Sequence, residues 1–196
     1  MDRTGFFLLF VALSTIAWCV VVPVFALLFS WTEYVSGINW LYLPHGLRMM
    51  LVLLFGVAGA LGISIGSHVL RWAELDGLTS NPSVDFPMAL VSGLAAYCAV
   101  LLTLREWPGK GLLPRIGQGI PAIDGRRLVL LAFVSAILNS GGHIAVRTVF
   151  GREQQPINDD FLIMLVGDFF GALVLLYTLK RIVLFFEKSE SGVSPL

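Results

Sequence analysis

Three ionisable residues, Arg48, His143 and Asp168, interrupt long apolar segments of this sequence. An ionisable side chain is costly inside a lipid bilayer, so each predicts either a functional site or a charged partner nearby. Each lies roughly seven residues from one end of the helix expected to contain it, which is about 10 Å at 1.5 Å per residue. If these helix ends face the same side of the membrane, the three side chains share one depth.

Arg48 and Asp168 carry opposite charges, so at equal depth we expect them to pair across the second and sixth helices. Such a pair has a purely structural alternative, in which it only fixes the register of the helices. In another alternative, Arg48 alone extends its charge to the membrane surface. Asp168 would then be free to meet His143 or a small ligand.

Asn139, His143 and Arg147 recur at every fourth position, which places them on one face of the fifth helix. This polar stripe is suited to lining a small wet cavity or contacting an anionic group. The alternative is a seam of hydrogen bonds between helices, a common way for polar residues to hold membrane bundles together.

The sequence gives no positive support for an enzyme, a metal site or a cofactor. His45, His68 and His143 lack the close spacing of metal-binding pairs, and no acidic cluster completes a site. The HExxH and P-loop motifs are missing from the sequence, and we find no nucleophile with a plausible base at helical spacing. We therefore expect no catalytic residue, no metal ion and no cofactor.

The composition is that of an integral membrane protein. Of 196 residues, 57% are hydrophobic and only 13% are charged, and the 13 basic and 13 acidic residues cancel. So few charges cannot solvate so much apolar surface, which excludes a soluble globular enzyme and a disordered chain. The first partner is therefore the lipid bilayer, and the balanced charge gives no indication of nucleic acid binding.

Four segments satisfy the requirement of about 20 apolar residues for crossing a bilayer. They are residues 5–30, 86–104, 128–150 and 161–179. Basic residues crowd the loop after the second of these segments and the C-terminal end, which predicts that both are cytoplasmic. If Arg3 also holds the N-terminus inside, the number of crossings is even, and residues 40–75 must contain two helices.

We therefore predict an all-α transmembrane bundle of about six helices, at residues 5–30, 40–56, 59–75, 86–104, 127–150 and 161–186. Gly56, Gly59 and Gly62 supply the reversal between the second and third helices. Five helices with the N-terminus outside is the alternative. The bundle forms a single domain, 1–187, followed by a short polar tail, 188–196, and both termini are expected on the cytoplasmic side of a bacterial inner membrane.

Two pairs of glycines have the spacing that lets membrane helices approach closely. One pair is Gly62 and Gly66, and the other is Gly167 and Gly171. We expect both pairs to lie at helix-packing surfaces.

Two short motifs carry a family resemblance: Trp40, Pro44, His45 and Gly46 at a helix start, and Gly167, Asp168 and Gly171 in the last helix. They resemble, in order, the Trp and Pro-x-Gly helix start and the Gly-Asp-x-x-Gly-x-Leu signature of bacterial membrane-associated sensor (MASE-type) domains. The predicted bundle is also similar to the six-helix substrate-binding subunits of energy-coupling transporters. Both resemblances imply a fold without a catalytic centre of its own.

Together these observations predict a stand-alone sensor-like or ligand-binding membrane bundle that acts through a membrane-protein partner or as a homo-oligomer. MASE-type domains commonly precede a kinase or cyclic-dinucleotide domain, whereas this sequence ends soon after its last predicted helix, so we expect it to act by contact. The alternatives are a structural accessory subunit of a membrane complex and a small-solute transporter component.

Overall fold

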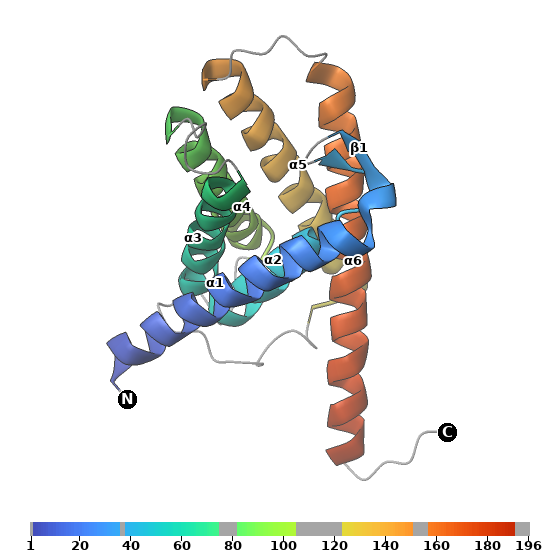
Figure 1. The fold of residues 1–196 in the computed structure, drawn as a ribbon. Coiled ribbons are helices and arrows are strands. Elements are labelled where there is room, and N and C mark those ends of the chain that lie inside the picture. The colour runs from blue at the N-terminus through green and yellow to red at the C-terminus, as the bar shows by residue number, and fades with distance from the viewer. Residues whose placement is uncertain (1, 36–37, 75–81, 105–122, 151–156, 191–196) are drawn as a thin grey trace.

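Six α-helices dominate the computed structural model, which describes residues 2–35, 38–74, 82–104, 123–150 and 157–190 (Figure 1). They are α1 (Arg3–Leu28), α2 (Leu43–Phe55), α3 (Val57–Glu74), α4 (Pro82–Thr103), α5 (Gly125–Phe150) and α6 (Ile157–Glu190). A 3-10 turn, η1 (Ser30–Thr32), and two antiparallel strands, β1 (Glu33–Val35) and β2 (Ile38–Asn39), connect α1 to α2. The all-α bundle predicted from the sequence is confirmed.

Among the described residues, four helices are long and apolar enough to cross a membrane. The segments concerned are Arg3–Leu28, Pro82–Thr103, Gly125–Phe150 and Asp159–Phe185. They contain the four clean apolar segments of the sequence almost entirely, so length and composition alone were sufficient to find them. By contrast, the 13 residues of α2 are only about 20 Å long at 1.5 Å per residue.

The segment between β2 and α4 contains two helices, as the charge distribution predicts. Gly56 separates α2 from α3 and has a φ of 58°, a backbone conformation that favours glycine. The other two glycines expected at this reversal lie inside α3 instead. A Cβ on Gly59 would meet the carbonyl of Leu51, and one on Gly62 would meet α1, so both serve close packing.

Consecutive helices run in alternating directions. Phe10 stacks on Phe55 while Phe25 contacts Tyr42, so α1 and α2 are antiparallel. The later helices, α3 to α6, alternate in the same way. The contacts that show this are Arg71 to Asp85 between α3 and α4, Met88 to His143 between α4 and α5, and both Asn139 to Asp168 and Arg147 to Asp160 between α5 and α6. The start of α1 and the end of α6 therefore lie at one end, called here the terminal end (Figure 1).

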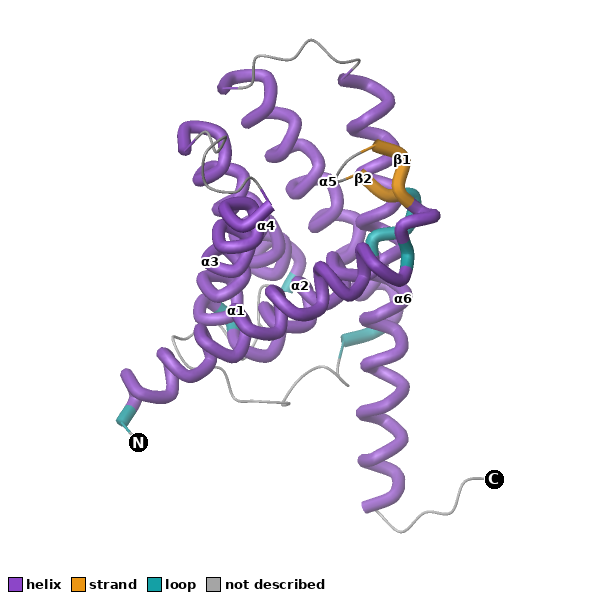
Figure 2. Tube along the Cα trace, viewed as in Figure 1, coloured by secondary structure: helices purple, strands orange, loops and turns teal. Residues whose placement is uncertain are grey.

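The opposite end, called here the hairpin end, carries the β1–β2 hairpin beside α6 (Figure 2). The sequence predicts only a loop over residues 31–39 and a helix from residue 40. The structure begins α2 three residues later, because the preceding backbone packs against α6, with the Tyr42 amide donating to the Gly167 carbonyl at 3.0 Å. Extended backbone at this depth is tolerated because it is covered by protein.

The interior divides into an apolar part and a polar part. Leu128, Leu131 and Leu176 belong to a continuous apolar cluster that fills the terminal half of the bundle. Buried polar side chains gather from the middle of the bundle toward the hairpin end. Residues 105–122 and 151–156, which underlie part of the predicted membrane orientation, lie outside the described residues.

Candidate functional site

The first turns of α2 place two polar residues in the middle of the bundle. Pro44 occupies the start of α2, where its missing N–H costs nothing and its fixed φ suits a helix. His45 and Arg48 follow at a spacing of three, so they share one helical face. That face is turned inward, since His45 is 0% and Arg48 only 3% exposed. A short helix that begins inside the bundle thus delivers an imidazole and a guanidinium to its centre.

Asn139 of α5 joins the arginine of α2 to the aspartate of α6. Its Oδ1 accepts a hydrogen bond from Arg48 Nη1 at 2.5 Å, and its Nδ2 donates to Asp168 Oδ2 at 2.6 Å. One amide thus binds both a cation and an anion with the atom that suits each. Interhelical hydrogen bonds in a membrane contribute roughly 0.6 kcal/mol each on average and about 1.7 kcal/mol at most.

His45 occupies the centre of the same group of side chains. Its Nε2 lies 2.9 Å from Ser135 Oγ, and its Nδ1 lies 3.1 Å from Arg48 Nη1 and 3.6 Å from Asp168 Oδ1. Arginine can only donate, so the 3.1 Å contact makes Nδ1 an acceptor. The neutral ring protonated at Nε2 then satisfies both short contacts, because Nε2–H donates a hydrogen bond to Ser135 Oγ.

We call His45, Arg48, Ser135, Asn139 and Asp168 the central polar cluster; its members are between 0% and 3% exposed. Trp18 of α1 closes it, with the Arg48 guanidinium carbon 4.9 Å from the ring centroid. A cation over an indole face is stabilised by the ring quadrupole. In the described part of the chain, Arg48 Nε is the one buried polar atom of the cluster without a hydrogen-bond partner. The cluster is therefore closed and joins α1, α2, α5 and α6.

The predicted direct pair of Arg48 and Asp168 does not form. Both residues lie in the cluster, as their equal depth suggests, but none of the ion pairs among the described residues joins Arg48 to Asp168. The Asn139 amide is bonded to both and separates them. The N-terminus of α2 lies beside Asp168. The positive end of the α2 helix dipole therefore also stabilises the carboxylate, without direct contact to an arginine.

The other members of the α5 stripe contact different partners. His143 lies one turn closer to the hairpin end than Asn139, where its Nδ1 is 2.9 Å from the Met88 sulfur of α4. Arg147, one turn further, binds Asp160 of α6 at 3.1 Å. His143 therefore does not join Arg48 and Asp168. The stripe forms the seam of interhelical contacts that was the alternative to a cavity.

The paired glycines lie where backbones approach each other. Gly62 and Gly66 of α3 face α1, and their carbonyls accept from Thr15 Oγ1 at 3.1 Å and from Cys19 Sγ at 3.7 Å. Gly167 of α6 faces Asn39, and a Cβ on Gly167 would collide with the backbone carbonyl of Asn39.

Gly171 and Gly46 lie in the same contact between α6 and the start of α2. A Cβ on Gly171 would strike the carbonyl of Tyr42, and one on Gly46 would strike Leu175 and the Gly171 carbonyl. Close approach at these glycines brings Asp168 to the cluster. Trp40 instead belongs to the hairpin, where it is 54% exposed and contacts the Tyr34 ring edge to face.

Sequence reasoning missed three members of this site. His45 was assigned only to the helix-start motif, although its spacing of three from Arg48 indicates a shared face. Ser135 extends the α5 stripe by one further turn, so the same periodicity would have found it. Trp18 carries no comparable signal, because a tryptophan in an apolar helix is ordinary.

Among the residues that the structure describes, the site shows no arrangement suited to a metal ion. In the parts of the chain that the structure describes, no group of three or more histidine, cysteine, aspartate or glutamate residues lies close enough to hold one.

Comparison with known proteins adds no relative. No family model, no curated protein and no solved structure matches this chain.

Proposed function

We propose that this chain is a sensor-like integral membrane bundle that acts through a protein partner and catalyses no reaction itself. The observation that carries the proposal is the central polar cluster, a closed network of an arginine, a histidine and an aspartate in the middle of four apolar helices. Ionisable residues placed this deep are costly and usually mark functional positions.

The cluster is suited to a change between two helix arrangements. It links α2 to α5 and α6 through bonds that depend on one amide and one imidazole, so a shift of α2 by one turn would break them together. Packed helices with discrete sets of polar contacts behave as two-state elements. A partner that binds one arrangement more tightly would shift the population toward it.

A continuous solute path receives less support. Polar groups extend from the cluster toward the hairpin end through His143, Arg147 and Asp160. Toward the terminal end the interior is filled by the apolar cluster that contains Leu128 and Leu131. A transport path needs polar groups on both sides of the midplane, so a transporter component is the weaker candidate.

A structural accessory subunit is the second candidate, and the closure of the cluster favours it. Its members are at most 3% exposed, so they offer no surface to a small ligand in this helix arrangement. Polar residues in membrane bundles also serve as packing contacts. In that case the cluster fixes helix positions, and a partner would recognise the outer surface alone.

The proposed location is a bacterial inner membrane, with the terminal end on the cytoplasmic side. Arg126, Arg127, Lys180 and Arg181 lie at that end, and the first turn of α6 at the other end carries Asp159 and Asp160. Basic residues concentrate on the cytoplasmic side of membrane proteins.

The test is to extract the tagged full-length chain from its native membrane and determine its stoichiometric partners by native mass spectrometry. The proposal expects a second protein at fixed stoichiometry, and an Asn139→Leu variant whose association with it is altered although the variant still folds. Ser140→Ala is the matched control, because the Ser140 hydroxyl is buried in the next position of α5 without a described partner. The proposal would be contradicted if the chain were isolated without a partner and transported a solute across vesicle membranes by itself. Unchanged association of Asn139→Leu with the partner protein would favour the accessory role.

A further inference from the structure

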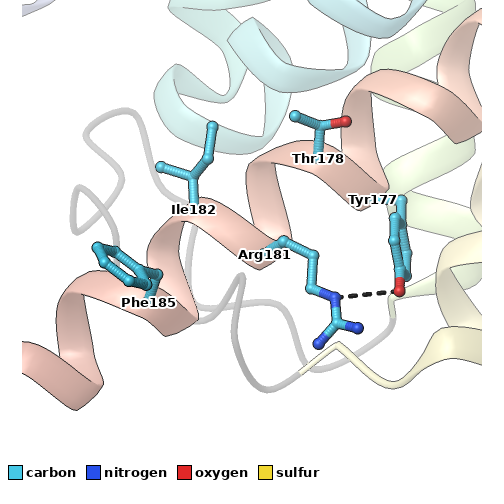
Figure 3. A pocket seen from close by; sticks show the side chains of 5 residues that line it. All are labelled: Tyr177, Thr178, Arg181, Ile182 and Phe185. Atoms are coloured by element: carbon cyan, nitrogen blue, oxygen red, sulfur yellow. Dashed lines mark hydrogen bonds between the residues drawn. The ribbon is translucent and has the colours of Figure 1, made fainter. Parts of the chain in front are cut away.

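A shallow hollow of about 590 Å³ lies along the second half of α6. It is lined by Tyr177, Thr178, Arg181, Ile182 and Phe185 (Figure 3). These residues form the last turns of the segment Asp159–Phe185, which is long and apolar enough to span a membrane. We propose that this hollow binds a phospholipid with an anionic headgroup, whose phosphate contacts Arg181 and whose acyl chain lies along the apolar residues.

The guanidinium of Arg181 is held in place at the hollow. Its Nε donates to the Tyr177 hydroxyl at 3.0 Å, and its central carbon lies 5.4 Å from the centroid of the Tyr177 ring. Figure 3 shows this bond between neighbouring turns of α6. The bond uses the Nε proton, and the fork of terminal N–H groups is the geometry that binds phosphate through two parallel hydrogen bonds.

Further basic residues lie at the same end of the bundle as the hollow. Lys180 Nζ binds the Ile123 carbonyl at 2.5 Å, which holds the start of α5 beside α6. The first turn of α5 adds Arg126 and Arg127, of which Arg127 lies 3.8 Å from Asp124. Basic residues at a membrane surface attract anionic lipids, and the attraction falls off with distance from the headgroup.

The apolar residues of the hollow explain why the ligand is a lipid and not a soluble anion. Ile182 is 48% and Tyr177 is 53% exposed, in a position that meets acyl chains and headgroups if α6 crosses the membrane. An aromatic ring and an arginine at a helix end are typical of the membrane interface. The inference rests on the membrane placement of the proposed function, but not on any protein partner.

The experiment is native mass spectrometry of the delipidated full-length protein, titrated with phosphatidylglycerol or with phosphatidylcholine of the same acyl chains. We expect the wild type to bind phosphatidylglycerol more tightly. Arg181→Gln should weaken phosphatidylglycerol binding about fivefold and remove the preference, whereas Arg181→Lys should keep most of it. Arg126→Gln is the matched control at the same end, and it should change binding less than Arg181→Gln does.

Ile182→Gln provides a second variant that does not depend on the charge. It should weaken the binding of both lipids, because it places a polar group against the acyl chain. Equal binding of the two lipids by the wild type, or unchanged phosphatidylglycerol binding in folded Arg181→Gln, would overturn the proposal. The proposal would also be overturned if inorganic phosphate alone bound the wild type as tightly as phosphatidylglycerol does and lost this binding in Arg181→Gln. A partner protein found or not found in the native membrane leaves these results unchanged, so the two proposals fail separately.

Discussion

Asn139 is the residue on which the central polar cluster depends most. Its amide is bonded to Arg48 on one side and to Asp168 on the other, while His45 connects the same two residues by longer contacts. A buried charge that loses its hydrogen-bond partner costs more than the bond contributes. Removing this amide should therefore affect the stability of the whole bundle.

We predict that Asn139→Leu lowers the free energy of unfolding in detergent by about 1–3 kcal/mol, since two hydrogen bonds to charged groups are lost. Leucine has a similar size but keeps Arg48 and Asp168 apart. Ser140→Ala should change stability by less than about 0.5 kcal/mol, because its hydroxyl has no described partner. Equal stability of Asn139→Leu and wild type in a titration with sodium dodecyl sulfate would show that the amide bonds are unimportant.

The sequence identified the charged members of this cluster but not their arrangement. Arg48 and Asp168 are recognisable because charges are rare in apolar segments, and helical depth alone correctly brings them together. The intervening position of Asn139 depends on how α5 is rotated against α2 and α6, which periodicity within one helix does not determine. For the same reason, His143 was expected in the cluster, yet it contacts Met88.

Among the elements, α2 is the most unusual, because it begins inside the bundle after a stretch of extended backbone. Its position depends on Gly167 and Gly171 of α6, where the chain from Asn39 to Leu43 lies against the helix backbone. The amide of Tyr42 is bonded to the carbonyl of Gly167 at this point. A side chain on either glycine would push α2 away and move His45 and Arg48 out of reach of Asp168.

Gly171→Ala should accordingly lower the unfolding free energy by about 1–3 kcal/mol, the usual cost of forcing extra atoms into a packed interior. The added methyl would meet a backbone carbonyl, which cannot rotate aside as a side chain would. Gly141→Ala is the matched control in α5, since a Cβ there meets nothing within 4 Å. It should raise stability by up to about 1 kcal/mol through helix propensity, and an equal gain from Gly171→Ala would refute the close contact.

The sequence predicted the long helices well and the segment between α1 and α2 poorly. Helices such as α1 and α4 follow directly from uncharged apolar length, which is a local property. The late start of α2 does not, because it results from packing of residues 39–42 on α6, more than a hundred positions further along the chain. The division into α2 and α3 was predicted because basic residues at both ends of the chain require an even number of membrane crossings, which is a property of the whole chain.

For the whole molecule, the alternating helix directions place both ends of the described chain on one side. We expect reporters fused after Leu113 and after Leu196 to read cytoplasmic, a reporter after Gln154 to read periplasmic and an N-terminal tag to be cytoplasmic, following the basic charge of the terminal end. A periplasmic N-terminal tag together with a cytoplasmic C-terminus would require an odd number of crossings and exclude six.

The most direct measurement is the coupling energy between Arg48 and Asp168, obtained from the unfolding free energies of Arg48→Met, Asp168→Ala and the double variant. We predict that the double variant loses less than the sum of the two single variants, by about 1 kcal/mol or more, because each single change leaves a buried charge uncompensated. The same cycle measured with Leu in place of Asn139 should give a smaller coupling energy. Additive losses with Asn139 present, or equal coupling with and without it, would contradict the conclusion that this amide joins α2, α5 and α6.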